Sequence, residues 1–175
     1  NPFVITFVFV ISLFLWKFII LKESFLLGDY SVQHLPWSRF LADSLANLSL
    51  PLWTPYMHSG FPILAEGQIG ALYPPNLIMY FFLPYKIAYT YNIFLHFVLA
   101  GIFMYIYVRE IGMSKTAATI TVIAFLFGSG YGGCFYSIMS LKVLAWFPLV
   151  LFLTEKLFKK EELLYGILIG IVISV

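Results

Sequence analysis

Long runs of apolar residues dominate the chain. A bilayer core is about 30 Å thick, so a helix needs roughly 20 apolar residues to cross it. Five apolar runs reach or approach that length: residues 2–21, 85–108, 117–136, 143–158 and 163–175, the last incomplete. The pattern predicts an all-α, polytopic helical membrane protein with four crossings and part of a fifth.

Composition supports this class of protein. Of the 175 residues, 62% are hydrophobic, 20% aromatic and only 10% charged, which excludes an ordinary soluble domain. The first run is too long for the apolar part of a secretory signal and lacks a small-residue cleavage site, so we expect it to remain as an anchor. We expect residues 1–175 to form the N-terminal part of one longer transmembrane domain.

Charged residues between the runs predict the orientation in the plasma membrane. Short cytoplasmic loops collect lysine and arginine. Arg109 and Lys115 lie between the second and third runs, and Lys156, Lys159 and Lys160 lie between the fourth and fifth. Both loops are therefore predicted to be cytoplasmic. The same count puts the N-terminus in the cytoplasm and the long loop of residues 22–84 outside.

The outer loop is too long for a simple connector, and its pattern predicts structure. From Pro36, a favourable first helical residue, the apolar residues Trp37, Leu41, Leu45 and Leu48 recur at helical spacing. We expect residues 36–48 to form an amphipathic helix that lies in the membrane interface.

The remainder of the loop predicts a rigid path with one more short helix. Residues 50–62 contain three prolines and a glycine, which exclude a regular helix. Residues 63–72 are expected to form a second short helix, and Pro74 and Pro75 to interrupt the chain after it. Further along, Gly112 predicts a helix end and Ser114 the cap of the next helix.

Four segments, taken in order, resemble a known family. They are GDYSVQHLPW, LPLWTPYMHSGFPILAEGQIGALYPPNL, REIGMSKTAATITVIAFLFGSG and AWFPLVLFLTEKL. Together they are similar to the YfhO family of bacterial polytopic membrane proteins, within the GT-C glycosyltransferases. The resemblance covers nearly the whole chain, and its outer-loop part is the most specific. It implies a GT-C-like fold, a polyprenyl-phosphate-linked sugar donor, and a catalytic carboxylate in the first outer loop, at the position of Asp29.

The chemistry of such a transfer is compatible with a single carboxylate. A polyprenyl phosphate leaves as a stable anion, so the protein mainly has to deprotonate the acceptor hydroxyl and neutralise phosphate charge. Asp29 is the candidate base; without the resemblance, a loop residue or helix cap is the favoured role. Arg39, Lys86 and Lys142 are candidate phosphate partners. Snorkelling to the headgroups is favoured for Lys86 and equally open for Lys142, which stands where a histidine is expected in relatives.

Three further polar residues of the outer loop are candidates for substrate binding. Gln33 and Gln68 suit hydrogen bonds to sugar hydroxyls or to loop backbone, and both roles are open. Glu66 is a second acidic group. The sequence requires no cofactor, and a divalent metal shared by Asp29 and Glu66 is an alternative with little support, since an exposed interfacial glutamate is favoured.

These expectations define one function and two alternatives. The favoured function is transfer of a sugar from the lipid-linked donor to an acceptor of the cell envelope, with inversion at the anomeric carbon. Membrane lipids are the other expected partners, and nucleic acid is not expected. A lipid or solute transporter would carry polar groups toward the midplane of the membrane, whereas the polar residues here gather in one outer loop. A noncatalytic membrane assembly protein is the other alternative.

Overall fold

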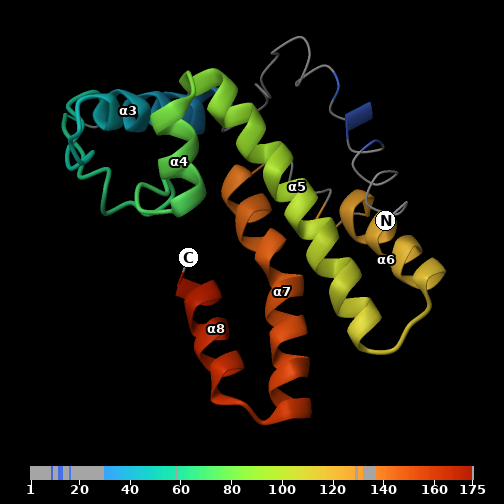
Figure 1. The fold of residues 1–175 in the computed structure, drawn as a ribbon. Coiled ribbons are helices and arrows are strands. Elements are labelled where there is room, and N and C mark those ends of the chain that lie inside the picture. The colour runs from blue at the N-terminus through green and yellow to red at the C-terminus, as the bar shows by residue number, and fades with distance from the viewer. Residues whose placement is uncertain are drawn as a thin grey trace. The chain divides into compact units, whose positions relative to one another are not determined.

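The described part of the chain is entirely helical. The computed structural model describes residues 9, 12, 13, 16, 30–57, 59–128, 130–131 and 137–174. These residues form a short π-helix, six α-helices and no strand: η1 (Tyr30–His34), α3 (Leu35–Ala46), α4 (Pro74–Phe82), α5 (Tyr85–Glu110), α6 (Lys115–Phe127), α7 (Ile138–Lys160) and α8 (Leu163–Ser174) (Figure 1). The all-α prediction is confirmed for this part. Asp29 and most of the predicted first span lie outside the described residues.

The chain divides into two compact units. Unit 1 comprises Asn1–Phe14 and Ile93–Val175, and unit 2 comprises Leu15–Asn92. The boundary falls within α5, so the first turns of this helix belong to unit 2 and the remainder to unit 1.

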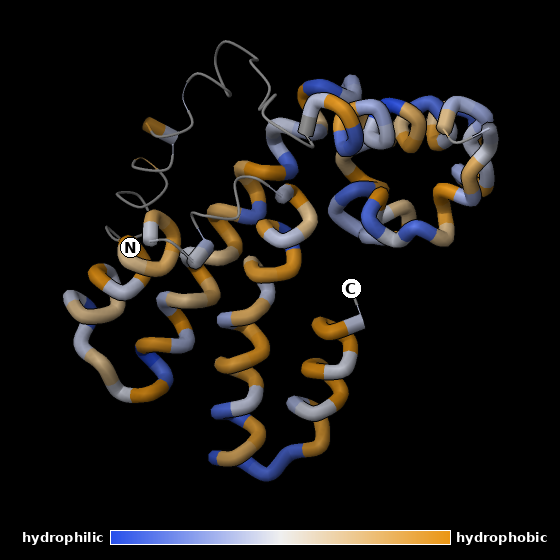
Figure 2. The backbone as a smooth tube through the Cα atoms, turned by 180° about the vertical axis from the view of Figure 1, so that it is seen from behind, coloured by the Kyte–Doolittle hydropathy of each residue, from blue (hydrophilic) through white to orange (hydrophobic). Residues whose placement is uncertain are grey.

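Unit 1 contains the long apolar helices. α5 has 26 residues and α7 has 23, and both are long and apolar enough to cross a membrane. They confirm the helices predicted over residues 85–108 and 143–158. α8 has 12 residues and packs against α7. Hydrophobic residues dominate both helices, and the hydrophilic residues gather at the turn between them (Figure 2).

The α5–α6 connection follows the predicted turn chemistry, but α6 is shorter than predicted. Gly112 has a φ of +90°, which favours glycine, and the Ser114 side chain accepts a hydrogen bond from the Ala117 backbone N–H. α6 ends at Phe127, before the end of the apolar run over residues 117–136. Gly128 leaves the helix with an extended backbone, at the start of the glycine-rich segment.

Unit 2 contains the helix that was predicted first in the outer loop, and part of its apolar face is buried within the protein. The predicted helix over residues 36–48 is present as α3. However, Trp37 and Leu41 are buried within the protein, and the Trp37 Nε1 donates a hydrogen bond to Met57 Sδ at 2.9 Å. The Tyr80 hydroxyl also reaches this helix, since it donates to Ser38 Oγ at 3.0 Å. These two residues of α3 therefore contribute to the core of unit 2, so protein covers this part of the apolar face of the helix.

The second short helix lies later in the chain than predicted. Residues 63–72 form successive turns, because Gly67 and Gly70 have φ values of +72° and +60° that an α-helix cannot contain. The helix begins instead at Pro74, where we expected an interruption. Proline is favourable in the first helical turn, because the N–H that it lacks has no partner there.

Candidate functional site

Three of the predicted binding residues meet in unit 2. The Gln33 Nε2 donates a hydrogen bond to Gln68 Oε1 at 3.3 Å, and the Gln68 Nε2 donates to Glu66 Oε1 at 2.7 Å. We call this set the Gln33–Gln68–Glu66 chain. Its first member lies on η1, and the other two lie in the turns before α4, so the fold joins positions 35 residues apart.

Hydrogen bonds through α3 fix one side of the Gln33–Gln68–Glu66 chain. The Tyr80 hydroxyl of α4 donates to Ser38 Oγ, which in turn donates to the backbone oxygen of His34 at 2.8 Å. Burial raises the pKa of Tyr80, so its hydroxyl stays protonated and remains a donor at physiological pH. The two bonds hold the end of η1, next to Gln33, against α4.

The other side of the Gln33–Gln68–Glu66 chain is fixed by Asn76, a buried asparagine of α4. The Asn76 Nδ2 donates to the backbone oxygens of Ile69 at 3.2 Å and Gly70 at 2.8 Å. The Asn92 Nδ2 of α5 donates to Asn76 Oδ1 at 2.7 Å, and both asparagines are buried. These bonds fix the turn that follows Glu66 and Gln68. A buried amide that loses its partners is costly, so the arrangement is well determined.

Gly70 makes the close approach of Asn76 possible. A Cβ at Gly70 would lie 2.5 Å from Asn76 Nδ2, which is closer than non-bonded atoms can approach. Its φ of +60° is also strained for other residues. Glycine at position 70 therefore allows both the left-handed backbone of the turn and the close contact with Asn76.

The arrangement offers hydrogen bonds to a polar, uncharged ligand. Two amides and a carboxylate provide both donors and acceptors, the combination that sugar hydroxyls require. Gln68 is exposed, and Gln33 and Glu66 are half-buried, so a ligand can reach the chain from solvent. α4 supports both halves of it, through Tyr80 and Asn76.

The three candidate phosphate partners are divided between the two units. Arg39, in unit 2, lies 3.7 Å from Asp43 through its Nε, and its guanidinium carbon is 5.8 Å from the centre of the Tyr85 ring. Both members of the Arg39–Asp43 pair are exposed, so this contact contributes little to stability and is easily exchanged for a phosphate. Lys142, in unit 1, lies near the start of α7 and is half-buried. Lys86 is exposed at the start of α5.

The described residues hold no group of three or more His, Cys, Asp or Glu side chains arranged for a metal ion. The metal shared by Asp29 and Glu66 falls outside this finding, because Asp29 is not among those residues. Within the structure, the Glu66 carboxylate accepts a hydrogen bond from the Gln68 amide.

The sequence did not indicate the supporting residues. Ser38 and Tyr80 lie 42 positions apart, and Asn76 and Asn92 lie 16 apart, so no local spacing relates them. The only signal available was an asparagine within each of two strongly apolar segments. A polar side chain there needs a buried partner, although the sequence does not say which one.

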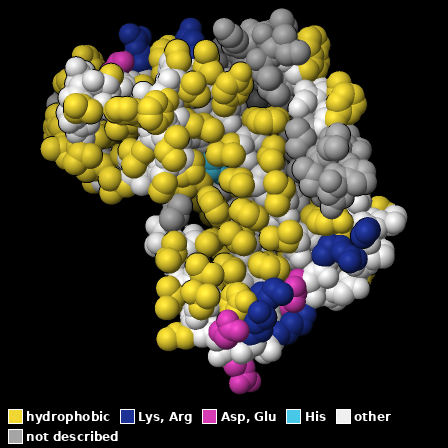
Figure 3. Space-filling view, viewed as in Figure 1, with side chains coloured by type: hydrophobic (Ala, Val, Ile, Leu, Met, Phe, Trp, Pro, Cys, Tyr) yellow, Lys and Arg dark blue, Asp and Glu magenta, His cyan; other side chains and the backbone are white. Residues whose placement is uncertain are grey.

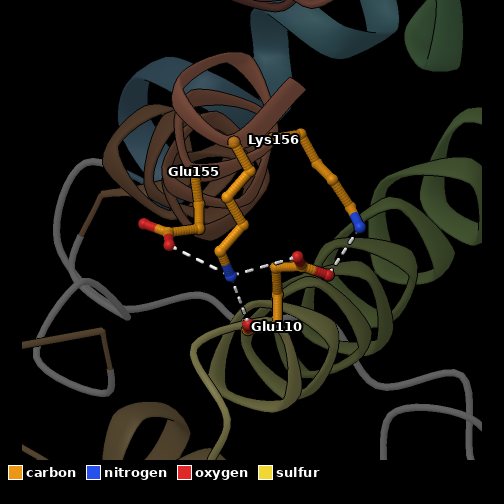
Figure 4. A network of polar contacts seen from close by, with 4 residues as sticks. Glu110, Glu155 and Lys156 are labelled. Carbon is orange, nitrogen blue, oxygen red and sulfur yellow. Dashed lines mark hydrogen bonds and ion pairs between the residues drawn. The ribbon is translucent and has the colours of Figure 1, made fainter. Parts of the chain in front are cut away.

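A second polar cluster, of ionic character, lies in unit 1. The Glu110 carboxylate, at the end of α5, is 2.6 Å from Lys156 Nζ and 3.3 Å from Lys159 Nζ, both on α7 (Figure 4). Lys159 also contacts Glu155 at 3.2 Å and donates to the Glu110 backbone oxygen at 2.8 Å. The cluster brings the ends of α5 and α7 together, so the two basic turns lie at one end of unit 1.

Comparison of the chain with models of known protein families, with curated proteins and with solved structures found no match.

Proposed function

We propose that this chain belongs to a membrane glycosyltransferase of GT-C type. The enzyme transfers a sugar from a polyprenyl-phosphate donor to an acceptor outside the cell. Asp29 removes the proton from the acceptor hydroxyl, which attacks the anomeric carbon as its bond to the phosphate breaks. Attack opposite the leaving phosphate inverts the anomeric centre.

The observation that carries this proposal is the Gln33–Gln68–Glu66 chain. Its three side chains supply hydrogen-bond donors and acceptors in a form suited to hydroxyl groups. Gln33 follows Asp29 by four positions in the sequence. The proposed base and the proposed sugar contacts are thus close neighbours along the chain.

The long helices support a location in the membrane. In an apolar 18-residue stretch of each helix, 44% of α5 and 28% of α7 is buried. Large apolar side chains that stay exposed on α7, such as Val143 and Phe147, are compatible with contact with lipid.

The phosphate of the donor needs a cationic partner, and Arg39 of unit 2 and Lys142 of unit 1 are each proposed for this role. An arginine can bind two phosphate oxygens at once, and a lysine provides a compact positive charge. Either cation would stabilise the negative charge that develops on the leaving phosphate. The mechanism requires no metal ion.

Substitution of Asp29 tests the proposed base. Asp29→Asn keeps the size of the side chain but removes its basicity, so turnover should fall by about a hundredfold or more while donor binding is retained. Asp29→Glu keeps the charge and moves it by one methylene, and should lose less activity. The measurement is sugar transfer by the full-length protein in membranes, with donor binding and expression followed in parallel.

Glu162→Gln is the control, because it likewise removes the charge of an exposed carboxylate, which lies in the turn between α7 and α8. It should leave turnover nearly unchanged. Near-normal turnover in Asp29→Asn would refute the assignment and direct the search to Glu66. A loss of turnover with intact donor binding would also distinguish an enzyme from a transporter or an assembly protein.

Lys142 is tested by donor affinity rather than by turnover. Lys142→Ala should weaken donor binding, and Lys142→Arg should retain part of it, because the positive charge is kept. Lys86→Ala is the control, since Lys86 is exposed at the other proposed outer helix end and is expected only to reach the headgroups. Equal donor affinity in the two alanine variants would show that Lys142, like Lys86, does not bind the donor phosphate and only reaches the headgroups.

A further inference from the structure

Unit 2 exposes large apolar side chains outside α3. In the segment of residues 48–56, Leu48 and Tyr56 are each 85% exposed and Trp53 is 57% exposed. The segment also exposes Leu50 and Leu52, and nearby segments expose Leu72, Ile78, Phe81 and Phe82. Apolar side chains cover much of the α3–α4 part of the molecule in the view of Figure 3. Large apolar side chains in such numbers indicate a surface that contacts a partner or a membrane.

The surroundings of these side chains carry almost no charge. Between residues 44 and 82 the sequence contains a single charged residue, Glu66. Arg39 and Asp43 precede this stretch on α3, and Lys86 follows it on α5. A protein partner is usually bound by a surface with a polar rim, whereas a long uncharged stretch matches the hydrocarbon side of a lipid interface.

The side chains are also of the kinds found at membrane interfaces. Trp53 and Tyr56 are amphipathic rings, which concentrate at headgroup level. Trp53 is held in place while it remains exposed, because its indole ring lies against Gly60, where an added Cβ would be 2.4 Å from the ring. A fixed aromatic ring loses little conformational freedom when it enters an interface.

The connection between α4 and α5 fixes where this surface would meet lipid. α4 ends at Phe82, and α5 begins at Tyr85 after only two residues. Phe81 and Phe82 therefore lie beside the start of a helix that can cross the membrane. If α5 enters the bilayer at this end, the last turn of α4 lies at headgroup depth.

From these observations we infer that residues 48–56 and the exposed side of α4 form the membrane-contacting surface of unit 2. It contacts the boundary between the headgroups and the acyl chains of the bilayer that α5 crosses. The inference therefore rests on the membrane location in the proposed function. This surface takes the interfacial place that the sequence pattern assigned to α3. It would hold the Gln33–Gln68–Glu66 chain near the depth of a lipid-linked phosphosugar.

Site-directed fluorescence can test this surface. The variants Leu48→Cys, Leu52→Cys and Tyr56→Cys are made separately in full-length protein that carries Cys134→Ser, labelled with an environment-sensitive dye, and reconstituted into phosphatidylcholine vesicles. Ala65→Cys is the control for an exposed position beside Glu66, and Phe147→Cys is the control for an exposed position within α7. Quenching is measured with iodide in water and with nitroxide-bearing lipids.

Labels at 48, 52 and 56 should be quenched by nitroxide lipids nearly as strongly as the label at 147. Their quenching by iodide should be severalfold weaker than that of the label at 65. If these three labels behave like the one at 65 while 147 remains accessible to lipid, the surface is wrong and the membrane location stands. If 147 is also quenched mainly by iodide, the membrane location fails as well. Protection from both quenchers that disappears at a lower protein-to-lipid ratio would assign the surface to a second copy of the chain and overturn the inference.

Discussion

The two units use different polar interactions to fix their helices. In unit 2, neutral side chains hold the turns against α4, with Asn76 and Asn92 buried and Tyr80 bonded to Ser38. In unit 1, the ends of α5 and α7 are joined by ion pairs around Glu110 that are only partly shielded from solvent. Buried neutral hydrogen bonds depend on exact partners, whereas ion pairs near a surface tolerate changes in geometry and weaken in salt.

This difference matches the tasks that we assign to the two clusters. A site that binds a sugar needs side chains fixed to within fractions of an ångström, which the amide bonds of Asn76 provide. At the ionic cluster, the ends of two helices need only to stay together. Lysines there also favour the predicted orientation.

The largest expected effect concerns the side of the membrane on which each cluster lies. In a Cys134→Ser background, Asn47→Cys in unit 2 should react with an impermeant thiol reagent applied to intact cells, and Met113→Cys in unit 1 should not. Both positions are exposed, so access to the reagent and not burial decides the result. Labelling after permeabilisation shows that position 113 is reactive. External labelling at 113 with none at 47 would overturn the orientation and remove the basis for an outer active site.

The next effect should come from breaking the neutral cluster. Asn76→Ala removes two bonds to backbone oxygens and the partner of Asn92, so we expect unfolding free energy to fall by about 2 to 4 kcal/mol. The measurement is unfolding of the solubilised protein with increasing SDS. Asn47→Ala is the control, because the Asn47 amide makes an exposed bond to the Asp43 backbone oxygen. Its effect should stay within about 0.5 kcal/mol. Equal effects of the two variants would show that burial of Asn76 adds nothing.

The regular parts of this structure follow from the sequence, and the support of the candidate site does not. Apolar runs predicted α5 and α7, and Gly112 with Ser114 predicted the turn after α5, because each of these signals is local. The prediction of a helix over residues 63–72 was wrong because Gly67 and Gly70 adopt left-handed conformations. Glycine can adopt this conformation but does not have to, so its presence in the sequence does not reveal it.

Three of the candidate residues lie together in the structure, and the role predicted for them stays a prediction. Gln33, Glu66 and Gln68 were chosen for their hydrogen-bonding groups, and the structure brings these three together. The contribution of Asn76 depends on contacts with Ile69, Gly70 and Asn92, which only the folded chain creates. The burial of Trp37 and Leu41 is similar, since the sequence shows that a helix face is apolar but not whether protein or lipid covers it.

A smaller effect should separate the two glycines of the turn. Gly70 and Gly67 both have positive φ, so alanine at either position should cost about 1 kcal/mol in backbone strain. Only at Gly70 does the new Cβ meet Asn76, whereas at Gly67 it meets nothing within 4 Å. Gly70→Ala should therefore be less stable than Gly67→Ala by about a further 1 kcal/mol, measured by the same SDS titration.

A double substitution shows whether Asn76 causes this difference. In the Asn76→Ala background the contact is gone, so the alanine variants at 67 and 70 should lose similar amounts of stability. If the difference between the two glycines persists there, the close approach of Asn76 is not its cause.

The smallest expected effect is in the ionic cluster of unit 1. Glu110→Gln removes the negative charge that Lys156 and Lys159 share, while the Glu110 backbone oxygen can still accept the hydrogen bond from Lys159. We expect a loss of stability smaller than that of Gly70→Ala, with Glu162→Gln, an exposed position in the following turn, as the control. At a salt concentration of about 1 M the Debye length is only about 3 Å, so the difference between Glu110→Gln and its control should shrink. The loss in Asn76→Ala should not change, because its hydrogen bonds are neutral and buried. If the effect of Glu110→Gln is as insensitive to salt as that of Asn76→Ala, the contrast between the two clusters is wrong, and the end of α5 is held by packing and the Lys159 hydrogen bond rather than by charge.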